Sequence, residues 1–196
     1  MKPTSHSTLT RLSALATIVV VALAVAGCGR HTLTGVSQDA LSSGGEPYFN
    51  VGPVTYQVQA SRQLNAFADD DVQYLAGVKD AQNIGPDQFW FGVFLWAKNQ
   101  TKEDQTTASD FTLTDSSGDV YRPVTLDASV NPFAWTSQTL SPDEIQPAPG
   151  STASDGETGG SLILFKLNYS AYSNRPLTLE IYAPGSSTPS RVSLDL

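Results

Sequence analysis

The chain has 196 residues, and its 11 Lys and Arg against 19 Asp and Glu give it a net charge of −8. That length suits one domain of ordinary size. The acidic balance, without any basic run, excludes a nucleic-acid-binding protein, because phosphate contacts need clustered Lys and Arg. One cysteine (Cys28) and two histidines (His6 and His31) exclude an internal disulfide, Cys/His zinc sites and Ser-His-Asp or Cys-His catalysis. We therefore expect no cofactor and no metal ion.

Residues 1–27 are predicted to be a signal peptide. Lys2 and Arg11 give a positively charged start without an acidic residue, and residues 12–26 then carry no charge. A membrane-spanning helix needs about 20 apolar residues, so this shorter stretch fits the apolar core of a signal peptide better than a span.

The four residues Val25-Ala26-Gly27-Cys28 directly follow this apolar core. They resemble the lipobox of bacterial lipoprotein precursors. The resemblance implies that the Cys28 thiol takes a diacylglyceryl group and that cleavage between Gly27 and Cys28 makes Cys28 the new N-terminus. Two or three acyl chains of the palmitate type anchor a protein durably. The resemblance therefore predicts a protein attached to the extracytoplasmic face of the cell membrane. The alternatives are an ordinary signal peptide before an incidental cysteine, or an uncleaved anchor.

Residues 28–50 are predicted to form the lipidated N-terminus and a flexible tether, because they are rich in Gly, Ser and Thr and show no periodicity. His31 lies in this tether, where a solvated side chain is a better interpretation than a metal ligand. The folded domain is predicted over residues 51–196.

Alternation of apolar and polar residues predicts strands throughout this domain, and no helical stripe of ten residues occurs in it. The most apolar segment is predicted to be a central strand, and the turn at Gly118 is predicted to join a hairpin. Seven to eight short strands predict an all-β fold, an immunoglobulin-like antiparallel β-sandwich. In chain order the predicted strands are residues 54–60, 71–78 (a weaker candidate), 88–99, 111–114, 120–124, 161–169, 176–183 and 191–196.

Residues 127–160 form a long insertion in this pattern. Connections beyond about 15 residues are usually functional or disordered. We predict that residues 131–135 pack onto the sandwich, whereas residues 147–160, which are rich in Pro, Gly, Ser and Thr, are mobile.

Several motifs within residues 51–183 follow a recognisable order. They are Lys98-Asn99, Phe111-Thr112-Leu113-Thr114-Asp115, Gly118, Tyr121-Arg122-Pro123 and the late apolar segments 160–165 and 177–181. This order resembles the telokin-like, immunoglobulin-fold domain of bacterial surface lipoproteins, also called Mpr-like, whose function is largely unknown. The aromatic segment 89–96 and the insertion depart from the family pattern. The resemblance implies a sandwich fold and no catalytic residues.

The central strand is apolar on both faces. One row holds Phe89, Phe91, Val93, Leu95 and Ala97, and the other holds Trp90, Gly92, Phe94, Trp96 and Lys98. Because Lys98 is costly to bury, the second row is predicted to point outward. Trp90, Phe94 and Trp96, with Trp135, are then candidate ligand-binding residues, since exposed apolar patches often mark binding sites. The alternative, which we favour, is that Phe133, Trp135 and the surrounding insertion cover this row as a second small core.

The acidic residues suggest neither a metal site nor an active site. Asp69-Asp70-Asp71 could offer oxygen ligands to Ca²⁺, but neighbours in an extended chain point in opposite directions, so a solvated turn is the better interpretation. Asp115 and Asp119 flank the hairpin turn and are interpreted as structural. Glycoside hydrolysis needs two carboxylates about 5–10 Å apart, and no spacing singles out a pair. The formal candidates are Glu103, Asp104, Asp143, Glu144, Glu157 and Glu180.

These observations predict a lipid-anchored, extracytoplasmic binding or interaction module of the bacterial cell envelope that is not an enzyme. Its expected contacts are the membrane, through the lipid on Cys28, and an envelope glycan or protein. The alternative function is a small carboxylate-dependent hydrolase of the envelope. A transport-related substrate-binding lipoprotein is disfavoured, because the sequence lacks the βαβ alternation of a two-lobed binder.

Overall fold

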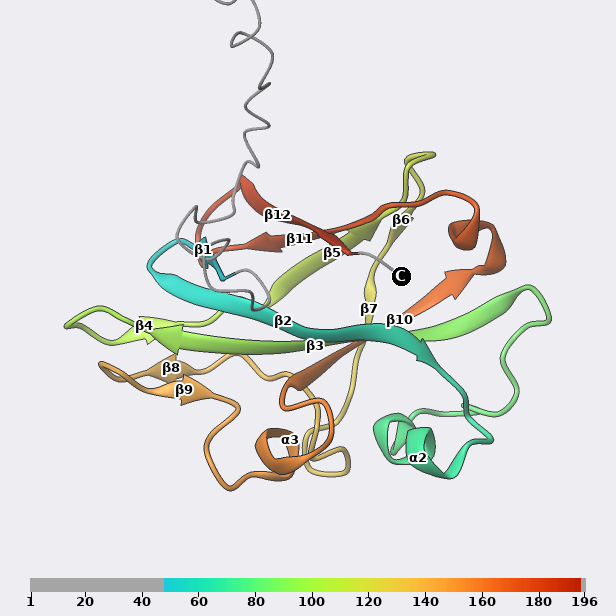
Figure 1. The fold of residues 1–196 in the computed structure, drawn as a ribbon, viewed down its shortest axis with the longest axis horizontal. Helices are drawn as coiled ribbons and strands as arrows, with labels where there is room; N and C mark the ends of the chain where they lie inside the picture. Colours follow the sequence, from blue (N-terminus) through green and yellow to red (C-terminus); the bar gives the residue numbers. More distant parts are fainter. Residues whose placement is uncertain (1–47, 195–196) are drawn as a thin grey trace, which may run out of the picture. The chain divides into compact units, whose positions relative to one another are not determined.

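The computed structural model describes residues 48–194, and every structural statement below concerns this range (Figure 1). The predicted signal peptide, the lipobox with Cys28 and the predicted tether as far as residue 47 lie outside the described residues, as do residues 195–196. None of the helices within the range has the length and apolar character needed to cross a membrane.

The first of two main sheets is built around the most apolar strand. Its strands run in the order β1-β2-β3-β10-β7, with β9 also pairing with β3, and all pairs are antiparallel. The strands are β1 (Phe49–Val51), β2 (Val54–Leu64), β3 (Gln88–Asn99), β7 (Pro123–Val124), β9 (Ile145–Gln146) and β10 (Ser161–Asn168).

The second main sheet is antiparallel and has the order β12-β11-β5-β6 (Figure 1). Its strands are β5 (Asp110–Thr114), β6 (Val120–Tyr121), β11 (Leu177–Tyr182) and β12 (Pro189–Leu194). A small third sheet pairs β4 (Gln105–Thr106) with β8 (Thr139–Leu140), and the helical turns are α2 (Asp69–Val72), η2 (Gln73–Leu75), α3 (Thr152–Asp155) and η3 (Tyr169–Tyr172). The all-β sandwich predicted from the sequence is confirmed.

The two main sheets bury one apolar core between them. Phe91, Val93 and Leu95 of β3 face this core, and Leu179 and Ile181 of β11 enter it from the other sheet. Alternate residues of a strand point to opposite faces, so the period-2 pattern of the sequence puts one apolar row of each strand here. Burying each such side chain contributes about 1.5–3 kcal/mol, which makes this inter-sheet core the main source of stability.

The chain changes sheets between β6 and β7. Tyr121 in β6 pairs with Leu113 of the second sheet, whereas Pro123 in β7 pairs with Phe165 of the first sheet. Consequently β6 covers only the end of β5, and the first half of β5 pairs with β11 alone among the described strands. This crossing leaves the sandwich open along one side, between β5 and the segment that follows β7.

The hairpin between β5 and β6 is organised by one buried carboxylate. Asp115 Oδ1 accepts hydrogen bonds from the N–H groups of Ser117 and Asp119, both at 3.0 Å, and from the Ser117 hydroxyl at 2.7 Å. Burial by itself raises the pKa of Asp115, but the hydrogen bonds from Ser117, Asp119 and Asn174 outweigh it, so the net pKa is lowered. The structural interpretation of Asp115 is therefore correct.

The prediction of a strand over residues 71–78 is wrong. The chain instead forms α2 and η2, and the Ala68 carbonyl accepts hydrogen bonds from the N–H groups of Asp71 and Val72, both at 3.0 Å. The buried residues of this stretch are Asp71, Tyr74 and Leu75, a spacing of three to four that belongs to a helix and not to a strand.

The insertion is only partly as predicted. Residues 131–135 pack onto the sandwich as expected, with Phe133 buried. The expected mobile segment 147–160 is instead folded and contains α3, whose Ala153 is buried and whose N-cap, Ser151, accepts a hydrogen bond from the Ser154 N–H at 3.2 Å. Its small residues allow close packing, because a Cβ at Gly160 would lie only 3.0 Å from the Phe94 backbone.

Candidate functional site

The aromatic row of β3 does point outward from the inter-sheet core, but two of its members are covered. Phe94 is fully buried, and Trp90 is 6 % exposed. The Phe94 ring meets the Tyr74 ring edge-on at 4.9 Å, and the Tyr74 ring meets Phe133 at 4.7 Å. Trp90 and Phe94 are therefore not an exposed binding surface, and the favoured alternative of a second small core holds for them. Phe133 and the α2–η2 segment form the cover, whereas Trp135, which was expected to take part, packs against the inter-sheet core.

Asn131 ties the insertion to this second core. Its fully buried side chain donates to the carbonyls of Tyr74 at 2.8 Å and Ala76 at 3.2 Å, and it accepts from the Phe133 N–H at 3.0 Å. Trp90 is fixed in a similar way, since its indole N–H donates to the Ala81 carbonyl at 2.8 Å. These bonds satisfy polar groups that would otherwise be costly to bury, so the cover over the row is built into the fold.

The other two candidate tryptophans lie in different places. Trp96 is half-buried on the outer row, where its ring meets Tyr48 edge-on at 5.8 Å. Trp135 packs instead against the inter-sheet core, with its ring 6.0 Å from Tyr56 and 5.9 Å from Phe111. The four candidate residues therefore do not form one surface, and Trp135 lines a pocket between the two main sheets.

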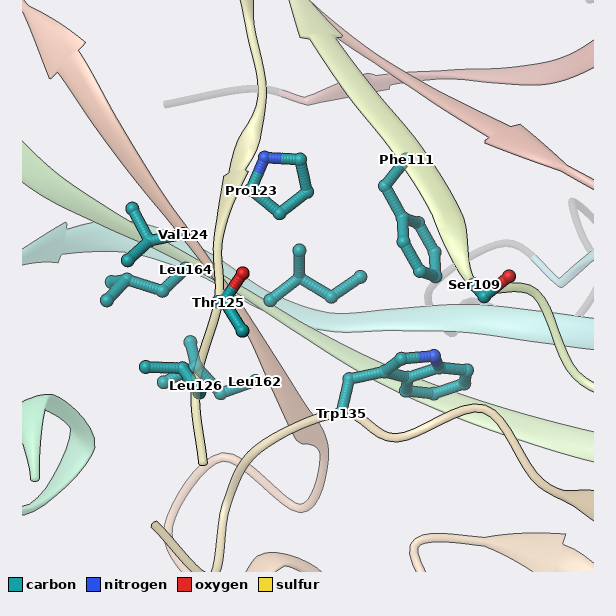
Figure 2. A pocket seen from close by; sticks show the side chains of 10 residues that line it. Ser109, Phe111, Pro123, Val124, Thr125, Leu126, Trp135, Leu162 and Leu164 are labelled. Atoms are coloured by element: carbon teal, nitrogen blue, oxygen red, sulfur yellow. The ribbon is translucent and has the colours of Figure 1, made fainter. Parts of the chain in front are cut away.

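That pocket fills the open side of the sandwich, and we call it the edge pocket (Figure 2). Ser109 and Phe111 of the β5 side face Pro123 and Thr125 across it, and Trp135 closes a third side. Its volume is about 200 Å³. Leu126 and the β10 residues Leu162, Ile163 and Leu164 supply further apolar surface, and the lining includes no charged residue.

Trp135 is held in position at the edge pocket by the backbone of Ala108. The indole N–H donates to the Ala108 carbonyl at 2.8 Å, and the Ala108 N–H donates to the Tyr56 hydroxyl at 2.7 Å. Burial raises the pKa of Tyr56 to about 12, against the opposing effect of the bond from Ala108. Tyr56 is therefore a neutral phenol at physiological pH, and the wall carrying Trp135 stays uncharged.

Sequence reasoning found Trp135 but missed the rest of the edge pocket. Phe111 and Ile163 have the alternation of ordinary core residues, and Ser109 and Thr125 resemble any exposed polar residues. The pocket exists because the chain changes sheets near Pro123. That residue has no backbone N–H, which favours an edge position, and it is the single local signal that could have pointed to the opening.

The acidic residues singled out in the sequence are dispersed. Asp71 turns inward and pairs with Arg62 at 2.6 Å, and its second carboxylate oxygen accepts from the Asn65 N–H at 2.8 Å. Asp69 and Asp70 are exposed on α2. Over residues 48–194 no three His, Cys, Asp or Glu side chains come together as a metal site.

The carboxylates considered for hydrolysis do not line the edge pocket. Asp143 lies 3.6 Å from the Lys98 ammonium, and Glu180 pairs with Arg191 at 2.8 Å. Glu144 accepts from the Ser141 N–H at 2.7 Å. The hydrolase alternative stays a prediction that these contacts do not test.

No protein-family model matches the chain, and no curated protein matches it. Among solved structures it is similar to ycdA of Bacillus subtilis, a candidate lipoprotein (TM-score 0.46, 14 % identity, 78 % of this chain covered). That match spans 38 % of the length of ycdA. It is also similar to a conserved hypothetical protein of Bacillus anthracis (TM-score 0.46, 11 % identity, 76 % of this chain and 93 % of the other) and to yjhA of Bacillus subtilis (TM-score 0.42, 13 % identity, 76 % and 96 %). At these identities no residue role is transferred.

Proposed function

We propose that this chain is a lipid-anchored binding module of the bacterial cell envelope and that the edge pocket is its binding site. The observation that carries the proposal is an open, uncharged pocket between the two main sheets, beside the half-buried indole of Trp135. Concave apolar sites with a few polar groups are the usual form of a binding site.

The size of the edge pocket favours one apolar group of a larger partner. A cavity of about 150 Å³ lined by Leu, Ile and Phe is enough for benzene, whereas whole-ligand pockets usually have about 300–1,000 Å³. At about 200 Å³, the edge pocket fits a single aromatic ring or a branched aliphatic group.

The lining of the edge pocket also separates the two predicted partner classes. Ser109 and Thr125 are its only side chains with a hydroxyl, and it contains no carboxylate or amide side chain. A sugar ring would lose hydrogen bonds to water that two hydroxyls cannot replace. We therefore favour a protein as the partner, with one of its apolar side chains inserted into the pocket, and not an envelope glycan.

The anchor part of the proposal rests on the lipobox and on the resemblance to telokin-like lipoprotein domains. The chain has a net charge of −8, so anionic headgroups repel its surface and electrostatic attraction cannot attach it to a membrane. Acyl chains on Cys28 supply that attachment instead.

Fluorine NMR tests the site directly, because the chain contains only three tryptophans. Residues 28–196 with Cys28→Ser, labelled with 5-fluorotryptophan, are titrated with toluene as a neutral ring probe. We expect a shift of the Trp135 resonance, while Trp96, which lies on the outer row away from the edge pocket, serves as the internal control. Thr125→Phe, which places a ring over the mouth of the pocket, is expected to weaken binding by about tenfold, the equivalent of about 1.4 kcal/mol.

Thr188→Phe is the matched control, since Thr188 is also exposed but lies in the loop between β11 and β12. This variant should bind toluene as the parent protein does. Equal shifts of all three resonances, or a Thr125→Phe protein with unchanged affinity, would show that the edge pocket is not the binding site.

A further inference from the structure

A second apolar pocket lies beside α2, and we call it the α2 pocket. Its volume is about 460 Å³, and its apolar lining comes from Ala66, Leu75, Val78 and Ala81. These residues belong to the margin of the second core or pack against it. The α2 pocket is larger than the edge pocket and involves none of the same residues.

Large apolar side chains stand exposed next to this pocket. Val72, on its wall, is 49 % exposed, and Phe67, which follows the lining residue Ala66, is 72 % exposed. Phe67 is the most exposed large apolar residue in the described part of the chain. Exposed apolar surface rimmed by polar residues marks interaction sites, and a phenylalanine and a valine on one short segment are more than scattered surface residues.

Three carboxylates either line the α2 pocket or stand within three residues of the lining residue Val72, and we call them its rim. Asp69 and Asp70 precede Val72 on α2, Asp80 lines the pocket, and all three are exposed and make no ion pair within residues 48–194. Asp71 does not add to this charge, because Arg62 neutralises it at 2.6 Å. Lys79 is the only basic residue between residues 66 and 83. The pocket therefore combines an apolar interior with a rim on which three carboxylates stand against one cation, Lys79.

The apolar interior and the acidic rim together restrict which kind of partner the α2 pocket can bind. Bacterial membranes carry anionic headgroups, which the three carboxylates repel. A second copy of the chain would also bring like charge, since its net charge is −8. A basic protein segment satisfies both features of the site, because its cations meet the rim while an apolar side chain enters the pocket.

We propose that the α2 pocket docks a basic segment of a partner protein, in which a large apolar side chain is flanked by lysines or arginines. The apolar side chain occupies the space over Leu75 and Val78 and covers Phe67 and Val72. The flanking cations lie against Asp69, Asp70 and Asp80. This surface is separate from the edge pocket and does not depend on the function proposed for that site.

Labelled peptides test the proposal on the full chain, held in nanodiscs of zwitterionic phosphatidylcholine so that cationic peptides do not bind the lipid. Fluorescence anisotropy compares the peptide Lys-Lys-Phe-Lys-Lys with Lys-Lys-Ala-Lys-Lys and Glu-Glu-Phe-Glu-Glu. We expect the first peptide to bind most tightly, the alanine peptide to bind several-fold more weakly and the glutamate peptide not to bind. Affinity should fall with added salt, because exposed charges are screened.

Variants assign this binding to the α2 pocket. The combined change Asp69→Asn, Asp70→Asn and Asp80→Asn should weaken binding of the phenylalanine peptide about tenfold, because it removes three exposed charge pairs at once. Asparagine also tolerates the positive φ of residue 80. Val72→Ser should lower the affinity for the same peptide, but this affinity should still fall with added salt. Asp104→Asn, an exposed carboxylate between β3 and β4, is the matched control and should change nothing.

The possible outcomes separate this proposal from the one for the edge pocket. Thr125→Phe should leave the peptide affinity unchanged. A negative result at one pocket therefore does not count against the proposal for the other. The proposal is overturned if the phenylalanine peptide does not bind, if the alanine peptide binds equally well, or if the triple asparagine protein keeps full affinity. Tighter binding of the glutamate peptide, or dimerisation of the chain through this face, would also overturn it.

Discussion

Phe94→Ala is expected to lower the free energy of unfolding by about 3–5 kcal/mol, the range found when a buried phenylalanine is cut to alanine. The Phe94 side chain is 0 % exposed and lies in the second core, with its ring 4.9 Å from that of Tyr74. The substitution leaves a cavity between β3 and the segments that cover it. Urea denaturation followed by circular dichroism measures the change.

The control for this prediction is Val120→Ala, because Val120 is apolar but 58 % exposed. Its free energy of unfolding should stay within about 0.5 kcal/mol of the parent value. A loss below about 1 kcal/mol for Phe94→Ala would mean that the outer face of β3 is not covered as described, since a truncated core phenylalanine cannot cost so little.

Cys28→Ala is expected to abolish lipid labelling and to release the protein from membranes almost completely. The lone thiol is the predicted attachment point of the acyl chains, and the acidic chain is not drawn to an anionic membrane by its charge. The measurement is incorporation of labelled palmitate in a bacterial host, with membrane and soluble fractions compared by immunoblot.

Ser42→Ala is a suitable control, because it changes a small residue of the predicted tether and leaves Val25-Ala26-Gly27-Cys28 intact. This protein should be labelled and should remain with the membranes. A Cys28→Ala protein that still incorporates palmitate, or that stays in the membrane fraction undiminished, would remove the lipid anchor from the account.

The sandwich and the two faces of its central strand could be predicted because each depends on a local pattern. Alternation with a period of two put Phe91, Val93 and Leu95 on one face of β3. Trp90 and Phe94 share the other face with Lys98, and this face was predicted to point outward because a lysine is costly to bury. The structure agrees on both faces. Whether the outward row is covered depends on a segment about forty residues further along the chain, and no local pattern contains that information.

The errors arose where short segments fold against distant ones. Residues 71–78 contain too few apolar residues to separate a strand from two short helical turns, and Tyr74 is buried because Phe94 and Phe133 surround it. Residues 147–160 have a composition typical of a mobile loop. They fold because Ala153 and Gly160 are small enough to pack closely against neighbours that the sequence does not place beside them.

The edge pocket illustrates the same limit for the candidate site. Trp135 could be selected from the sequence as an aromatic residue of the segment expected to pack onto the sandwich beside the outer row of the central strand. Its partners Phe111, Thr125 and Ile163 come from three other segments, which meet only because the chain changes sheets between β6 and β7. A binding site of this kind depends on topology and not on a motif.

Photoaffinity mapping of the edge pocket tests the central claim most directly. Residues 28–196 with Cys28→Ser are irradiated with a neutral aromatic probe that carries a diazirine, and the adducts are located by mass spectrometry. If the edge pocket is the binding site, we expect adducts on the residues that line it, foremost Trp135 and Ile163, and their loss in Thr125→Phe. Adducts scattered over the surface, or an unchanged pattern in Thr125→Phe, would contradict this claim.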